Sequence, residues 1–151
     1  MLRWRAWARD DTGSAALEFV TVGVILLVPL VYLVIVLGSI QEQSLGAEAA
    51  ARHMARAIAL APDAATAESR SEEVLAAVVD EYGIDADSVK VSSTCVPASA
   101  ECPAAGATLV VTVEVTVRLP FVPSILGIDR ALAIPLEASA VQKISRQWGS
   151  E

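Results

Sequence analysis

The chain has few aromatic side chains and a single histidine. Aromatic residues make up 5% of the 151 residues, and small alanines account for much of the 54% that are hydrophobic. A domain of this composition buries few large side chains, so we expect a modest core. A Ser-His-Asp relay or a histidine metal site needs more partners than His53 alone, and there is no Gly-rich phosphate loop. We therefore expect no enzyme, no catalytic residue, no cofactor and no bound metal.

Basic residues are also scarce. The chain has 11 Lys and Arg against 18 Asp and Glu, which gives a net charge of -7, and no basic cluster follows Arg56. Nucleic acid is therefore not an expected partner. Solubility is the preferred explanation for the acidic excess, and an acidic binding patch is the alternative.

One acidic segment is similar to the start of a calcium loop. It is Asp85-Ala86-Asp87-Ser88, but Lys90 stands where such a loop needs glycine, and no glutamate closes it. A turn or a cap at the start of a strand is the preferred interpretation.

The chain does contain one long apolar run. Residues 19–41 are 23 consecutive residues without a charge, which as a helix is about 35 Å, enough to cross a hydrocarbon core. Secretory signals have shorter apolar regions. We therefore predict a retained transmembrane helix, in which Pro29 is either a tolerated kink or a bending point for assembly.

The charges around this run predict its orientation. Arg3, Arg5 and Arg9 precede it, and the Arg-rich flank of a first helix usually stays in the cytoplasm. Residues 42–151 are then expected outside the cytoplasmic membrane, with the chain crossing it once.

The two cysteines fall on this predicted oxidising side. Six residues separate Cys95 from Cys102, and a local disulfide is the preferred interpretation. Free thiols or metal ligands are the alternatives, although one pair without a second pair or a nearby histidine does not complete a four-coordinate site.

Helical patterns cover the first half of the chain. A nearly continuous helix is predicted over residues 14–61, with a rough apolar stripe in its second half (Leu45, Ala49, Met54, Ile58 and Ala61). Pro62-Asp63 ends it. A second helix is predicted over residues 69–82, from a capping box of Ser69 and Glu72 to a stop at Gly83. Its apolar face is expected to lie against a sheet.

Three strands are predicted in the second half, over residues 89–96, 108–119 and 132–143. The middle one alternates valine with Thr, Glu and Arg, and Pro135 places the last one at an edge or delays its start. A Pro-rich connection links these two strands. The expected fold class is α+β: a long N-terminal transmembrane helix, then a small ectodomain with a helix packed on a three-stranded antiparallel sheet. The cysteines are expected in the first hairpin loop.

The start of the apolar run carries the most specific motif. A basic leader is followed by Gly13-Ser14-Ala15-Ala16-Leu17-Glu18-Phe19 and then by the long apolar helix. This pattern resembles the signal of type IV prepilins. The resemblance implies that residues 1–13 are a leader, that a membrane prepilin peptidase recognises Glu18 and Phe19, and that it cuts between Gly13 and Ser14.

The resemblance also implies a role for Glu18 after cleavage. Its carboxylate would offset the new amine of Ser14 in a neighbouring subunit, and losing either charge would leave the other uncompensated in a low-dielectric bundle. The alternative is a carboxylate at the membrane interface that favours the helix N-terminus.

The motif together with a C-terminal pattern, residues 117–123 and 132–140, looks like the TadE-like minor pilins (pseudopilins) of tight-adherence systems. Residues 62–151 would be an extracytoplasmic domain that the much shorter major pilins lack. The implied partners are the prepilin peptidase, other pilin subunits, the assembly platform and the membrane. We expect a subunit of the cytoplasmic membrane that enters or primes a cell-surface pilus. The alternative is a single-pass membrane-anchored envelope protein that binds a partner through its ectodomain.

Overall fold

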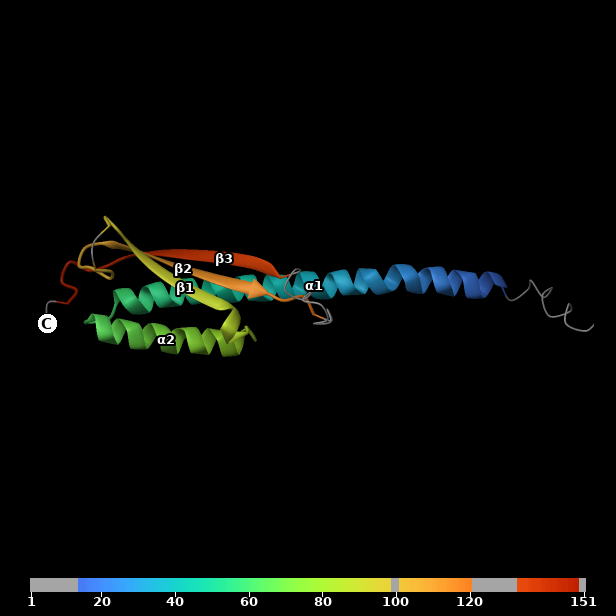
Figure 1. Ribbon diagram of the computed structural model, residues 1–151, viewed down its shortest axis with the longest axis horizontal. Coiled ribbons are helices and arrows are strands. Elements are labelled where there is room, and N and C mark those ends of the chain that lie inside the picture. Colours follow the sequence, from blue (N-terminus) through green and yellow to red (C-terminus); the bar gives the residue numbers. More distant parts are fainter. Residues whose placement is uncertain (1–13, 99–100, 121–132, 150–151) are drawn as a thin grey trace, which may run out of the picture. The chain divides into compact units, whose positions relative to one another are not determined.

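The computed structural model describes residues 14–98, 101–120 and 133–149. Two helices, a short 3-10 helix and three strands follow one another along the chain: α1 (Ser14–Ala59), α2 (Ala64–Glu81), η1 (Ala86–Ser88), β1 (Val89–Val96), β2 (Thr108–Val117) and β3 (Ile134–Lys143) (Figure 1). The chain divides into two compact units, Met1–Gly38 and Ser39–Glu151. The second, here named the C-terminal domain, contains the second half of α1 and everything after it.

Helix α1 confirms the predicted long helix. It runs without interruption through Pro29 and ends two residues before the predicted limit at residue 61. A proline inside a helix removes one backbone donor, and α1 remains α-helical across it. The helix is therefore continuous from the apolar run into the C-terminal domain.

Helix α2 begins five residues earlier than predicted. Asp63 is its N-cap, and the Asp63 carboxylate accepts a hydrogen bond of 2.7 Å from the Thr66 backbone N–H. This bond satisfies one of the free donors at the helix start, and it holds the pKa of Asp63 below its ordinary value. The predicted capping box at Ser69 and Glu72 was wrong, because both residues lie inside a helix that has already begun.

The end of α2 is as predicted. Gly83 has a φ of +58°, the left-handed region that glycine enters without steric cost. The Ile84 N–H donates to the Val79 carbonyl at 3.0 Å, and the Gly83 N–H donates to the Asp80 carbonyl at 3.4 Å. These two bonds form a Schellman motif, which turns the chain towards β1.

The sheet is antiparallel and has the order β1-β2-β3. Val113 of the central strand lies opposite Val91 of β1 and Ala138 of β3. The predicted edge position of Pro135 is confirmed, because β3 is an outer strand. Within the described residues, β2 ends at Val117 and β3 begins at Ile134. The prediction for residues 121–132, most of the Pro-rich connection and the start of the last strand, lies outside them.

The core lies on one face of the sheet. Alternate residues of β2 are at most 1% exposed: Leu109, Val111, Val113, Val115 and Val117. Burying a side chain of this size contributes about 1.5–3 kcal/mol. The intervening residues of β2 are more exposed. The alternating pattern of the sequence is therefore the pattern of burial.

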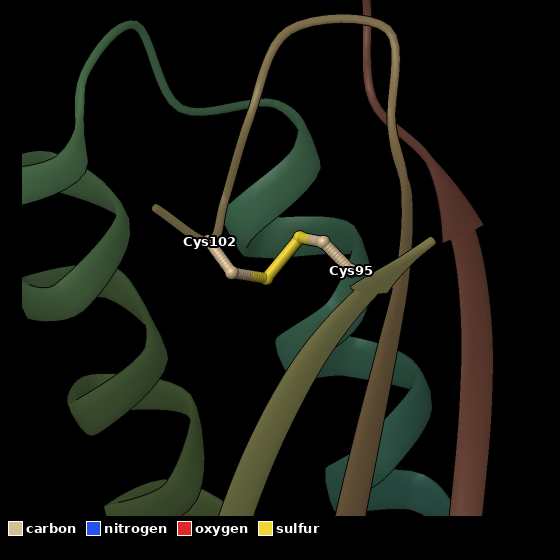
Figure 2. Close-up of a disulfide and its surroundings, with 2 residues drawn as sticks. All are labelled: Cys95 and Cys102. Atoms are coloured by element: carbon tan, nitrogen blue, oxygen red, sulfur yellow. A yellow bond between two sulfur atoms is a disulfide. The ribbon is translucent and has the colours of Figure 1, made fainter. Parts of the chain in front are cut away.

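The second half of α1 supplies most of the helical part of this core. Its buried residues are Ala47, Ala50, Ala51, Met54, Ala55, Ile58 and Ala59, whereas α2 buries Ala67 and Val78. Figure 2 shows α1 crossing directly behind the strands, with α2 to one side. The predicted stripe was wrong at Leu45, which is 60% exposed, and at Ala49, which is half-buried.

Helix α1 and the turn after α2 approach closely at Gly46. A Cβ atom at this position would lie 2.8 Å from Cδ1 of Ile84 and 2.9 Å from Cγ of Tyr82. These distances are shorter than van der Waals contact, so the absence of a side chain at Gly46 allows the turn after α2 to pack on α1. Helix α2 therefore runs back along α1, as the short connection between them favours.

Candidate functional site: the start of the apolar helix and the disulfide

Helix α1 contains the first residues of the predicted mature chain. Ser14 and Glu18 both have helical backbone, and they are four residues apart, about one turn and 6 Å along the axis. Residues at this spacing lie on the same side of a helix. The predicted leader of residues 1–13 and the predicted cleavage residue Gly13 lie outside the described residues, and so does the side chain of Ser14.

The surface of α1 after Glu18 is apolar on all sides. Phe19 is 81% exposed, and the large apolar side chains from Leu17 to Leu37 are nearly all exposed. A helix that is hydrophobic all round needs lipid or other helices around it. Within the described residues, α1 is the one helix long and apolar enough to cross a membrane.

One polar side chain in this stretch, that of Thr21, has a partner within the helix. The Thr21 hydroxyl donates to the Leu17 carbonyl at 2.7 Å. Because a threonine hydroxyl that bonds one turn back needs no water, Thr21 is compatible with an apolar environment. Glu18 is then the charged group that stands at the edge of the apolar run, with no further charge until Glu42.

The predicted disulfide is confirmed. Cys95 and Cys102 are bonded, with their Cα atoms 5.7 Å apart (Figure 2), a usual separation for this bond. Cys95 is the second-last residue of β1 and is buried, and Cys102 lies in the loop between β1 and β2. The bond therefore ties this loop to the end of the outer strand.

The acidic segment at residue 85 is a cap, as its preferred interpretation predicted. The Asp85 carboxylate accepts a hydrogen bond from the Asp87 backbone N–H at 3.1 Å, at the start of η1 and just before β1. It also forms an ion pair with Arg118, with a nitrogen–oxygen distance of 3.1 Å. Both oxygens therefore have protein partners. In the described ranges, no three His, Cys, Asp or Glu residues are grouped closely enough to hold a metal ion.

Two features of the C-terminal domain had not been predicted. The first is the N-cap at Asp63, for which the sequence signal is the Pro-Asp pair followed by alanines. The second is the C-terminal segment, which is joined to the rest of the domain by backbone hydrogen bonds. The Ile144 N–H donates to the Ala107 carbonyl at 2.9 Å, and the Gly149 N–H donates to the Pro62 carbonyl at 3.2 Å. The second of these bonds has no signal in the sequence, because it joins residues 87 positions apart.

The candidate site thus has two separate parts. Ser14, Glu18 and Phe19 lie at the beginning of α1, and the disulfide lies in the C-terminal domain. Comparison of the chain with protein-family models, with curated proteins and with solved structures found no match.

Proposed function

We propose that the chain is a minor pilin, a pseudopilin of a tight-adherence type IV pilus. One observation carries this proposal: helix α1 contains Ser14, bears Glu18 one turn later and then presents an uncovered apolar surface through Leu37. The combination of a short basic leader, a glycine, a carboxylate and an exposed apolar helix is the pattern that resembles the prepilins.

Processing converts one end of the chain from a leader into an assembly site. Hydrolysis of the bond between Gly13 and Ser14 adds water, releases the basic leader and leaves an ammonium group at Ser14. Because this ammonium would lie at the end of an apolar helix, it needs an opposite charge when helices pack together away from water. Glu18 of a neighbouring subunit supplies that charge in the proposed filament.

The apolar surface of α1 serves both stages in this proposal. Before assembly, lipid covers the helix in the cytoplasmic membrane. After extraction, the corresponding helices of neighbouring subunits cover it. The C-terminal domain is held outside the membrane throughout, where its disulfide is stable.

Mass spectrometry of the N-terminus tests the proposal. In cells with an active prepilin peptidase, we expect the mature chain to begin at Ser14, and a Gly13→Leu variant to keep its leader. A Gly23→Leu variant, which changes a glycine inside the helix, is the matched control and is expected to be processed. A wild-type chain that still begins at Met1 or Leu2 would overturn the proposal and favour a single-pass envelope protein that binds its partner through the C-terminal domain.

A further inference from the structure

Two depressions lie along α2, between this helix and β1. The larger has a volume of about 640 Å³ and apolar walls that include Leu75, Val79 and Val89. The acidic residues Glu72 and Asp80 also line it. The smaller, of about 340 Å³, includes Glu68 and Ser71 of α2 and Ser93 of β1. Together they are named the α2 groove. The α2 groove is apolar in its larger depression and has acidic residues along α2, and it fits a partner that is apolar and positively charged.

The groove leaves part of the sheet uncovered. Val91 points to the same face of the sheet as the buried Val113 opposite it, yet Val91 is 39% exposed. Because directly opposite residues share a face, Val91 would be expected to be buried with its partner. Val91 lies between Val89 and Ser93, which line the two depressions, so the face of β1 beside the α2 groove is only partly covered.

A strip of exposed residues on α1 is apolar and positively charged, which complements the apolar and acidic α2 groove. Leu45, Arg52 and Arg56 follow at intervals of seven and four residues, which places them on one face of α1. Leu60 comes directly after α1, and its N–H donates to the Arg56 carbonyl at 3.1 Å, so it continues the same face. All four are exposed, Leu45 by 60% and Leu60 by 67%. The strip is therefore apolar at both ends and positively charged between them.

The charges of the strip are available for a partner. Arg52 pairs with Glu48 at 2.9 Å, but both side chains are largely exposed, and such a pair contributes about 0–1 kcal/mol. Arg56 has no ion pair within the described part of the chain. A carboxylate from another molecule can therefore engage both arginines without displacing a strong interaction.

The strip and the groove also match in length. Residues 45–59 of α1 and residues 64–80 of α2, which include all the α2 residues that line the groove, span 14 and 16 helical steps, about 21 and 24 Å. The strip lies on the side of α1 away from its buried face, centred on Ala47, Ala51 and Met54, so it does not meet the groove of its own chain. A contact between the two surfaces needs a second copy.

We propose that the α1 strip of one copy docks in the α2 groove of a second copy, with Arg52 and Arg56 facing the carboxylates of Glu68, Glu72 and Asp80. The two surfaces differ, so the contact is heterologous and leaves a free strip and a free groove at its ends. Such contacts repeat along an open helical array. This inference rests on the proposed function, in which the chain is a pilus subunit. It identifies the surfaces through which the C-terminal domains of adjacent subunits contact each other.

Photo-crosslinking of the full-length chain in its own membrane tests the contact. A benzophenone amino acid at Leu45 of a tagged copy is expected to crosslink an untagged copy within residues 68–93. Arg56→Glu and Glu72→Arg are each expected to lower the yield of this product by about threefold to tenfold, since each places like charges opposite one another. The double variant, which exchanges the two charges, is expected to restore it.

Glu73→Arg is the matched control, because Glu73 is an exposed neighbour of Glu72 that does not line the groove. Retention of the disulfide in each variant shows that the domain is folded. Crosslinks that fall outside residues 68–93, a crosslinked protein other than a second copy, or a double variant as weak as the single ones would overturn the contact.

The N-terminus of the same crosslinked product separates the two proposals. A product that begins at Met1 and crosslinks within residues 68–93 would overturn the proposed pilin function and support the contact. A product that begins at Ser14 and crosslinks elsewhere would overturn the contact and support the function.

Discussion

Glu18 is the residue on which the proposed assembly depends most. It is the last charge before 23 uncharged residues, and in a packed bundle its carboxylate would be removed from water together with the amine of Ser14. Breaking such a buried pair by removing one member costs about 3–5 kcal/mol. A carboxylate at the membrane interface that only favours the helix N-terminus would contribute far less, about 0.3–1 kcal/mol.

We therefore expect Glu18→Ala subunits that have been processed at Gly13 to enter filaments poorly. A loss of about 3–5 kcal/mol corresponds to a decrease in incorporation of at least about a hundredfold. Glu18→Gln, which keeps the size and removes the charge, is expected to behave in the same way, whereas Glu42→Ala, which removes the next carboxylate on α1, is expected to assemble normally. The amount of subunit in sheared filaments measures the effect. Normal incorporation of Glu18→Gln would contradict the charge-pair argument.

At the scale of elements, local chemistry explains where the helices end. Asp63 begins α2 because its carboxylate accepts the Thr66 N–H, and Gly83 ends it because the last turn needs a left-handed residue. The pattern at Ser69 and Glu72 has the form of a capping box, but the alanines before it are strong helix formers and Asp63 is already a good cap. The sequence therefore contained a local signal for the start of α2, namely Asp63 followed by alanines.

The cap at Asp63 gives a prediction about pH. The hydrogen bond from the Thr66 backbone lowers the pKa of Asp63 from its ordinary value of 3.8, so the folded state favours the carboxylate. The stabilisation is present above this ordinary pKa and is lost as the pH falls through the lowered value. Asp63→Ala is expected to lower the melting temperature of the full-length chain in detergent by a few degrees at pH 7, with a smaller difference in strong acid.

Circular dichroism at the two pH values measures this difference. Glu73→Ala is the control, since it removes an exposed carboxylate from the same helix without removing the cap. An equal effect of Asp63→Ala at both pH values would show that the charge of Asp63 does not contribute.

At the scale of the whole molecule, the apolar helix and the disulfide point to the same setting. The helix is long and apolar enough to cross a membrane, and disulfides persist on the oxidising side of one. A chain with three arginines before the helix and both cysteines after it meets both conditions if its C-terminal domain lies outside the cytoplasm. The acidic surface of α2 then faces an aqueous compartment.

Alkylation tests this arrangement. In intact cells, Cys95 and Cys102 are expected to react with a maleimide only after a reductant has been added. Closing a loop of this size with a disulfide contributes about 2–3 kcal/mol by the chain-entropy relation, so reduction is also expected to lower the free energy of unfolding of the C-terminal domain by about this amount. Two reactive thiols without reductant would contradict both the bond and the predicted orientation. A Cys95→Ala, Cys102→Ala double variant, which reacts under neither condition, is the control.

The sequence by itself determined the elements, because their signals are local. A long uncharged run predicts α1, strict alternation predicts β2, and Pro135 at an outer strand follows from its missing donor. Only the tertiary structure decided which face of α1 is buried. Alanines occur all round the second half of this helix, so composition does not distinguish its sides, and the sheet and α2 select Ala47 and Ala51 while leaving Leu45 exposed. The contact at Gly46 and the α2 groove arise in the same way, because each joins residues that are far apart in the chain and adjacent only after packing.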